Sequence, residues 1–336
     1  MRAVGYRKSL SIEAAESLID VDVAKPAPSG RDLLVEIKAI SVNPVDTKVR
    51  KRAEPPAGEI KILGYDAAGV VAATGPDVTL FKTGDEVSYA GSIARQGTNA
   101  QFHLVDERIV GRKPKNLSFA EAAALPLTTI TAWEMLFDRL GVKRGDTADR
   151  RSLLIVGGAG GVGSIAIQLA RKLTGLNVIA TASRPETQQW VRTLGAHHVV
   201  DHSRPLDAEI KAAKLPVDLV FSVTGTDEHY AAIADVITPQ GRFGVIDDPK
   251  SFDAVKFKQK SVSVHWELMF TRAMFSTPDM IEQHRLLNEV AGMVERGEIE
   301  TTLAENLGTI NAANLKTAHG RIESGRARGK IVLEGF

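Results

Sequence analysis

The amino-acid sequence predicts an α/β protein of two domains, one built on a doubly wound parallel sheet and one on a β-barrel. The chain has 336 residues, which is enough for two domains of ordinary size. From residue 152 onward, apolar strands alternate with helices, as they do in a parallel sheet covered on both faces. Before residue 118, glycine turns separate short apolar runs, which is typical of a barrel.

The β-rich first part contains three recognisable strands. Residues 33–40 alternate charged and aliphatic side chains, as a half-buried strand does. Residues 67–73 form a second apolar run, which the turn 74–77 closes. A turn at Gly84 leads into a third strand near residues 86–89.

The pattern changes to helix near Ser118. This residue is a good N-cap, and Glu121 three positions later completes a capping box. Residues 131–136 continue as helix, and Gly141 ends it. Residues 152–156 then form a short strand that is apolar on both faces and therefore fit for a buried parallel sheet.

Strands and helices alternate through the second domain. We expect helices at 164–174, 186–194 and 227–237, and strands at 177–181, 198–200, 217–223 and 241–246. The tail contains an amphipathic helix at 279–296 and a strand at 329–333. That strand is too short to start another domain, so we expect it to rejoin the first. The predicted divisions are 1–123, 124–268 and 269–336.

Charge and composition exclude several classes of protein. The net charge is +1 with both signs interspersed, which argues against nucleic-acid binding. No apolar run could span a bilayer, and the N-terminus lacks the apolar core of a signal peptide, so we expect a cytoplasmic protein. The chain has no cysteine, which excludes disulfides, thiolate nucleophiles, Fe–S clusters and cysteine-ligated zinc.

A glycine-rich turn between a strand and a helix predicts dinucleotide binding. Gly158, Gly160 and Gly163 fit the pattern G-x-G-x-x-G. The first glycine is expected to permit the tight turn, the second to let the pyrophosphate approach, and the third to let helix and strand pack closely. The helix start at Gly161 and Val162 would then present free N–H groups to the phosphates.

The end of the next strand indicates which dinucleotide is bound. An NAD enzyme places Asp or Glu there, about 20 residues after the glycine turn, to accept from the ribose 2′-hydroxyl. This chain has Ser183 and Arg184 instead, with no carboxylate before Glu186. A hydroxyl and a guanidinium suit a 2′-phosphate, so NADPH is favoured over NADH. The alternative is that Arg184 is only a solvated residue at a helix start.

These features, with the segments 43–46, 64–71 and 329–333, resemble the medium-chain dehydrogenase/reductase superfamily over essentially the whole chain. Within it the chain looks most like the zinc-free quinone oxidoreductase branch, which includes bacterial proteins called zinc-type alcohol dehydrogenase-like. The resemblance implies a Rossmann domain and a GroES-like catalytic domain. Asn43 and Tyr65 stand where zinc enzymes have Cys and His, and the second Cys position falls near Leu127. The resemblance therefore implies that neither family zinc site can form.

Without a metal, the resemblance implies hydride transfer to a quinone or an α,β-unsaturated carbonyl, whose charge spreads over a conjugated oxygen. Asn43 and Tyr65 are the candidate donors to that oxygen, although Asn43 could be only a turn residue and Tyr65 only a core aromatic. Thr128 and Thr131 resemble nicotinamide contacts of relatives, with helix capping as the equal alternative. Asp46 is expected to fix its loop.

Two other functions remain open from the sequence. The first is an alcohol dehydrogenase with a non-standard metal site, although His197, His198 and His202 are more typical of a surface or loop than of joint ligands. The second is a protein that binds NADPH without catalysis. The resemblance also implies a homodimer, with a plausible edge strand at 241–246.

Overall fold

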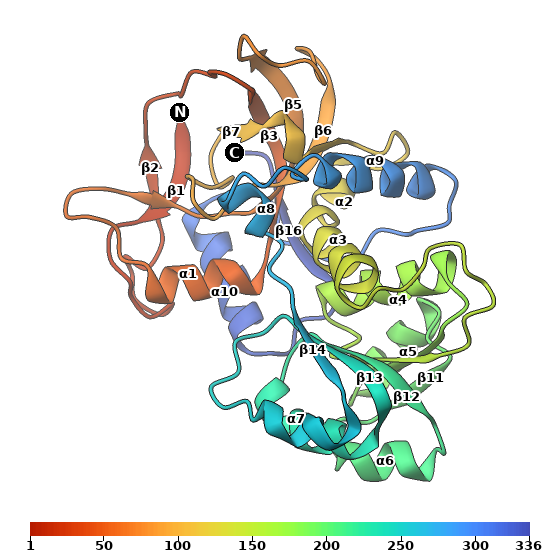
Figure 1. The fold of residues 1–336 in the computed structure, drawn as a ribbon. Helices are drawn as coiled ribbons and strands as arrows, with labels where there is room; N and C mark the ends of the chain where they lie inside the picture. The colour runs from red at the N-terminus through yellow and green to blue at the C-terminus, as the bar shows by residue number, and fades with distance from the viewer. The chain divides into compact units, whose positions relative to one another are not determined.

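The computed structural model describes all residues, 1–336, and divides into two compact units. Unit 1 consists of Met1–Leu127 and Phe270–Phe336, and unit 2 is the continuous segment Thr128–Met269. Both chain ends lie in unit 1 (Figure 1), where the Arg2 guanidinium donates to the Phe336 carbonyl at 2.7 Å. None of the helices is long and apolar enough to cross a bilayer.

Unit 1 is organised around one long strand, β3 (Asp32–Val42), which pairs with three others. The sheet order is β15-β16-β3-β5-β6-β8, and β7 also pairs with β3. Two irregularities in the β3–β5 register bend the strand, which is how one strand serves several neighbours. The other strands are β5 (Asp66–Thr74), β6 (Glu86–Ala90), β7 (Phe102–Asp106), β8 (Val110–Arg112), β15 (Leu303–Asn306) and β16 (Lys330–Glu334).

The C-terminal strand β16 pairs antiparallel with β3, from Ile331 opposite Val42 to Glu334 opposite Ala39. The tail therefore rejoins the first domain, as the sequence predicts. A small separate sheet has the order β2-β1-β4. Its strands are β1 (Arg2–Tyr6), β2 (Ile19–Asp22) and β4 (Lys61–Ile62).

The helices of unit 1 are short except for the last two in the chain. They are α1 (Pro44–Arg52), α2 (Phe119–Ala123), α8 (Thr271–Met274), α9 (Glu282–Glu295) and α10 (Ala312–Glu323), with a 3₁₀ turn, η1 (Glu107–Ile109). The predicted capping box is confirmed, because Ser118 Oγ accepts from Glu121 N–H and the Glu121 carboxylate accepts from Ser118 N–H. Helix α2 ends before Pro126, which starts α3 (Pro126–Trp133) as a new helix.

Unit 2 has a six-stranded parallel sheet in the order β11-β10-β9-β12-β13-β14. In chain order this is 3-2-1-4-5-6, the doubly wound arrangement of dinucleotide-binding domains. Central strand β9 is buried along its whole length, as its apolar sequence predicts. The strands are β9 (Ser152–Val156), β10 (Asn177–Thr181), β11 (His198–Val200), β12 (Val217–Ser222), β13 (Ile237–Val245) and β14 (Ser263–Trp266).

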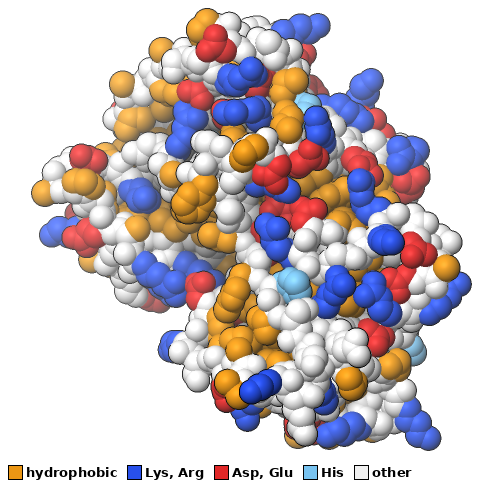
Figure 2. Space-filling view, in the orientation of Figure 1, with side chains coloured by type: hydrophobic (Ala, Val, Ile, Leu, Met, Phe, Trp, Pro, Cys, Tyr) orange, Lys and Arg blue, Asp and Glu red, His pale blue; other side chains and the backbone are white.

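The helices of unit 2 follow the strands in turn (Figure 1). After α3 comes a π-helical segment, η2 (Glu134–Arg139). The others are α4 (Gly161–Leu173), α5 (Pro185–Thr193), α6 (Leu206–Ala212), α7 (Thr226–Val236) and a 3₁₀ segment, η3 (Ala254–Lys260). On the face shown in Figure 2, Lys and Arg side chains alternate with Asp and Glu, so no large region of one sign is seen there.

The predicted edge strand at 241–246 is wrong. Residues 241–245 belong to β13, which has neighbours on both sides, and the edge strand on that side of the sheet is β14. The sequence does not reveal β14 as a strand because it has only four residues. Ser263 and Trp266 are exposed, and the two residues between them are half-buried. A run that short and that polar gives little periodic signal.

Candidate functional site

The glycine turn of unit 2 joins β9 to α4. Gly157 has φ +83°, a conformation that disfavours any side chain, so this residue makes the tight turn. The G-x-G-x-x-G pattern predicts this role for Gly158, and that prediction is wrong. Gly158 is required for packing instead, since a Cβ atom there would lie 2.8 Å from the Cβ of Ala180. The loop and β10 therefore pack too closely at this point to leave room for a side chain on Gly158.

The other two glycines of the motif differ in what surrounds them. A Cβ atom on Gly163 would lie 2.4 Å from the Gly157 carbonyl oxygen, so the predicted close packing of helix and strand is present. A Cβ atom on Gly160 would meet only that same oxygen, at 3.6 Å. Gly160 is also the N-cap of α4 and has no capping side chain. A side chain at Gly163 would therefore clash with the turn, whereas space remains beside Gly160.

The loop after β10 carries the residues predicted to select the cofactor. Ser183 is half-buried, and Arg184 is the N-cap residue of α5. The Arg184 guanidinium lies 3.2 Å from the Glu186 carboxylate, and both side chains are well exposed. This ion pair is of the weak, screened kind, which a phosphate can replace.

Thr128 and Thr131, the predicted nicotinamide contacts, lie on α3 and are both buried. Thr129 between them is also buried, and its hydroxyl has no hydrogen-bond partner. The three hydroxyls make α3 an unusually polar buried helix.

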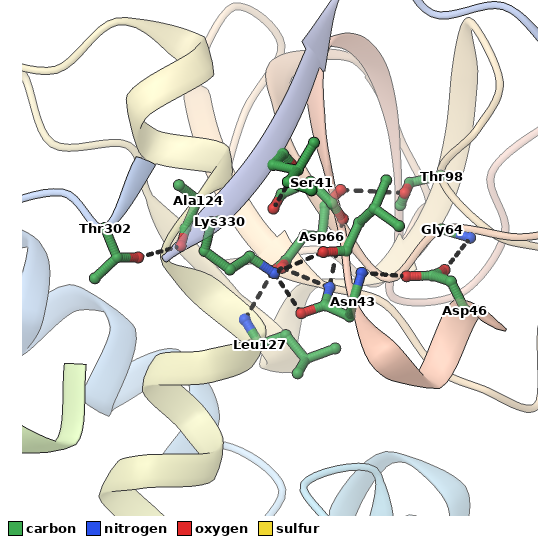
Figure 3. A network of polar contacts seen from close by, with 12 residues as sticks. Ser41, Asn43, Asp46, Gly64, Asp66, Thr98, Ala124, Leu127, Thr302 and Lys330 are labelled. Atoms are coloured by element: carbon green, nitrogen blue, oxygen red, sulfur yellow. Dashed lines mark hydrogen bonds and ion pairs between the residues drawn. The ribbon is translucent and has the colours of Figure 1, made fainter. Parts of the chain in front are cut away.

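Asn43 belongs to a buried polar network in unit 1 (Figure 3). Its amide nitrogen donates to Asp66 Oδ2 at 2.8 Å and more weakly to the Ser41 carbonyl at 3.4 Å. Its amide oxygen accepts from the Lys330 ammonium. Asn43 therefore has both of its polar atoms occupied inside the protein.

Lys330 and Asp66 form the charged centre of that network. The Lys330 ammonium lies 2.9 Å from Asp66 Oδ2 and also donates to the Val42 carbonyl at 3.3 Å. The second Asp66 oxygen accepts from Leu127 N–H at 2.7 Å. The side chains are 3% and 0% exposed, so this ion pair is fully removed from water. A buried pair of this kind depends on every partner being present.

Asp46 fixes the start of α1, as the sequence predicts. One carboxylate oxygen accepts from Asn43 N–H at 2.7 Å and the other from Gly64 N–H at 2.9 Å, which joins two loops. Burial raises the pKa of Asp46 to about 7, while the two N–H donors and Lys330 act in the opposite direction. Asp46 is thus a structural carboxyl that joins the start of α1 to the loop at Gly64.

Tyr65 is the residue of the former zinc positions that remains unpaired. Its ring is fully buried and packs edge-to-face on Phe270, with centroids 5.3 Å apart. Its hydroxyl has no hydrogen-bond partner. Burial, and next the charge of Asp46, raise the pKa of Tyr65 far above its ordinary value, so the hydroxyl keeps its proton. Tyr65 is thus a neutral hydrogen-bond donor whose hydroxyl has no acceptor within the protein.

Zinc does not fit these residues. An amide, a phenol and an aliphatic side chain stand at the three ligand positions that the resemblance implies, and a catalytic zinc takes His, Cys or carboxylate ligands. The amide and the nearest carboxylate are already bound to an ammonium cation, which would repel a second cation. No group of three or more His, Asp or Glu side chains in the structure is placed to hold a metal ion.

Sequence reasoning missed Lys330 and Asp66 as members of this network. Their positions are 264 residues apart, so no local pattern joins them. The available signal was a lysine at the start of a strand whose next three residues are aliphatic, because a buried lysine needs a partner. A hollow of about 430 Å³ in unit 2 lies elsewhere and is lined mainly by charged residues such as Lys143, Asp149 and Arg151.

Two family models match the chain. Residues 29–132 match the alcohol dehydrogenase GroES-like domain, and residues 194–333 match the zinc-binding dehydrogenase family. A zinc-type alcohol dehydrogenase-like protein of Staphylococcus aureus is 40% identical over 99% of both chains. A 2-methylene-furan-3-one reductase of Solanum lycopersicum is 30% identical over 99% of this chain and 79% of its own.

Solved structures agree with these matches. A Rhizobium etli structure of the zinc-dependent alcohol dehydrogenase type has a TM-score of 0.96 and 64% identity over 100% of this chain and 98% of its own. The quinone oxidoreductase of Escherichia coli in complex with NADPH has a TM-score of 0.85 and 25% identity over 99% of this chain and 100% of its own. The chain belongs to the medium-chain dehydrogenase/reductase superfamily and is an oxidoreductase related to quinone oxidoreductases and enone reductases.

Proposed function

We propose that this protein is an NADPH-dependent, zinc-independent reductase of quinones or α,β-unsaturated carbonyl compounds. The observation that carries the proposal is the set of side chains at the former zinc positions. The Asn43 side chain there accepts a hydrogen bond from the Lys330 ammonium group, and Tyr65 has a buried hydroxyl without a hydrogen-bond partner. This arrangement offers a neutral hydrogen-bond donor and no Lewis acid.

The geometry of the glycine turn supports the proposed cofactor. The N–H groups of Gly161 and Val162 at the start of α4 would hold the pyrophosphate, and the open side of Gly160 would let it approach. Ser183 and Arg184 would hold the 2′-phosphate in place of the Glu186 carboxylate. Bound NADPH supplies the hydride. Thr128 and Thr131 are proposed to contact its nicotinamide half.

Tyr65 is the proposed donor to the substrate oxygen. Hydride addition to a conjugated carbonyl or quinone places negative charge on that oxygen, and a donor aimed at it stabilises the charge. The Tyr65 hydroxyl keeps its proton throughout the physiological pH range because burial disfavours the phenolate. Asn43 is a proposed positioning residue, since its amide holds Asp66 and Lys330 and has no free atom for the substrate.

A parallel substrate screen tests this function. Purified protein is given NADPH or NADH with a quinone, an enal, an enone or a simple aldehyde, with and without EDTA. We expect turnover with the conjugated acceptors and NADPH, and no effect of EDTA. Reduction of the simple aldehyde that EDTA abolishes would show a metal-dependent alcohol dehydrogenase instead. NADPH binding without turnover on any acceptor would show a binding protein.

The proposed assembly is a homodimer, and the expected location is the cytoplasm. Edge strand β14 has no neighbour on its outer side, and Trp266 on that strand is 55% exposed. Leu268 just beyond it is 51% exposed. A second copy could continue the sheet there and cover both side chains. Light scattering after size-exclusion chromatography distinguishes a dimer, which we expect, from a monomer, which would contradict it.

A further inference from the structure

Two histidines lie together at the carboxyl edge of the unit 2 sheet. His202 follows β11, and His229 lies in the first turn of α7. Their ring centroids are 6.1 Å apart with an angle of 62° between the planes. Both side chains are partly buried. Hydride transfer as proposed above uses neither of them.

His202 is connected to the glycine turn through one hydroxyl. Gly157 N–H donates to Thr181 Oγ1 at 3.0 Å, and the same oxygen lies 3.0 Å from His202 Nδ1. The hydroxyl accepts from the backbone N–H and has its own hydrogen to give to Nδ1 of the neutral imidazole, while its second lone pair can accept from Nδ1–H once the ring is protonated. The proton of the neutral imidazole then lies on Nε2. This tautomer leaves an N–H available for a ligand.

His202 also lies next to the residues proposed to bind the 2′-phosphate. Strands β10 and β11 are parallel, with Thr181 opposite Val200. The pairing continues one residue further, since Ala182 N–H donates to the Val200 carbonyl at 2.9 Å. Two residues beyond the last pair, the two segments reach Ser183 and His202. The loops after both strands therefore present polar side chains at the same place.

The charges around the pair favour a neutral state in the free protein. Burial lowers the pKa of both histidines, and the charge of His229 lowers that of His202 further. Asp201 on the same loop and Glu228 on α7 act in the opposite direction. The cations on the neighbouring loops are already paired, Arg184 with Glu186 and Arg204 with Asp201. A phosphate dianion placed here would meet an imidazole able to accept a proton.

We propose that His202, supported by His229, is a proton-coupled part of the 2′-phosphate site, so that binding a 2′-phosphorylated adenosine draws one proton onto the pair. The phosphate would gain a charged donor that the free protein does not carry. The protein would thus discriminate NADPH from NADH more strongly as the pH falls. The inference rests on the proposed preference for NADPH.

Calorimetric titration with two small ligands tests the coupling. Adenosine 2′,5′-bisphosphate carries the 2′-phosphate, and adenosine 5′-monophosphate is the matched ligand without it. Near pH 7.5 the 2′-phosphate is already a dianion, since its second pKa is about 6, so proton uptake there belongs to the protein. Titrations in two buffers of different ionisation enthalpy give the number of protons. We expect uptake approaching one proton for the bisphosphate and none for the monophosphate.

The affinity should follow the same linkage. For the bisphosphate, Kd should increase by up to roughly tenfold per pH unit above neutral, while Kd for the monophosphate stays constant. His202→Gln keeps a donor near the Nε2 position but cannot ionise, so proton uptake and pH dependence should disappear. His229→Gln should reduce them. The exposed His198 on β11 provides the control, and His198→Gln should behave as wild type.

The outcomes separate this inference from the proposed function. If the bisphosphate binds more tightly than the monophosphate but without proton uptake, the histidine coupling is refuted and the preference for NADPH stands. If both ligands bind equally, the preference for NADPH fails and the inference fails with it. If proton uptake persists unchanged in both glutamine variants, another group accepts the proton and His202 is not the site.

Discussion

Replacing Lys330 tests whether the buried network holds unit 1 together. In Lys330→Met the apolar stem is retained and the ammonium is lost. Asp66 then keeps only Leu127 N–H at 2.7 Å and the Asn43 amide at 2.8 Å, in a site with no solvent contact. Removing one partner of a buried pair costs about 3–5 kcal/mol because the other charge is left uncompensated. The equilibrium constant for unfolding of unit 1 should therefore rise by roughly two to three and a half powers of ten.

The double variant Asp66→Asn/Lys330→Met removes both charges and should recover a large part of this loss. We expect a coupling energy of at least about 2 kcal/mol in the cycle of single and double variants. Lys38→Met is the matched control on β3, since the Lys38 and Glu36 side chains are 37% and 46% exposed. A surface pair of this kind contributes less than about 1 kcal/mol.

The distribution of tryptophan makes the measurement specific to one unit. Trp133, Trp190 and Trp266 all lie in unit 2, so their fluorescence reports that unit alone. Hydrogen exchange of the β3 and β5 amides reports unit 1. We expect fast exchange in those strands for Lys330→Met and slow exchange for the control. A loss of less than about 1 kcal/mol, or additive single and double variants, would refute the role assigned to the pair.

Three further predictions concern the site and its surroundings. Tyr65→Phe should lower kcat for a conjugated acceptor by about a hundredfold at unchanged thermal stability, because the lost hydroxyl has no partner in the protein; a large loss of stability would contradict this. Gly160→Ala should weaken NADPH binding, measured by fluorescence titration, by at least about tenfold with an unchanged melting temperature. Gly163→Ala should destabilise the fold, measured by calorimetry, by about 1–3 kcal/mol because its Cβ would lie 2.4 Å from a carbonyl oxygen. Burial, and next the charge of Glu134, raise the pKa of Glu267 to about 8, while the Arg139 guanidinium 2.7 Å from its carboxylate acts in the opposite direction. The folded state therefore binds this proton up to a higher pH than the unfolded chain, whose ordinary pKa is 4.5. The free energy of unfolding of unit 2, followed by tryptophan fluorescence, should therefore fall as the pH rises through that window, and Glu267→Gln should flatten the curve.

Local patterns in the sequence were sufficient to predict much of the fold. The apolar run of β9, the capping box at Ser118 and the packing role of Gly163 each depend on neighbours within a few residues, and the structure confirms them. The error over the tight turn has a local cause as well. Gly157 and Gly158 are adjacent, and only the backbone geometry shows that Gly157 takes the positive φ.

The centre of the candidate site could not be predicted in this way. The sequence marks Asn43 and Tyr65 by their positions in a family motif, yet the state of each side chain depends on distant partners. Asn43 loses its free amide to Lys330, which arrives on the last strand of the chain. Tyr65 keeps its free hydroxyl because nothing from the surrounding segments reaches it. Long-range pairing of this kind leaves no periodic signal.

Because β16 belongs to the sheet of unit 1, the two units complete their folding in a set order during synthesis. Unit 2 is one continuous segment, and it can complete its sheet while the chain is still growing from the ribosome. Unit 1 must wait for β16, and until then residues 39–42 of β3 lack one neighbouring strand and Asp66 has no cation. The first domain to be translated is thus the last to mature, and a chain that stops before Lys330 leaves it open to aggregation or proteolysis.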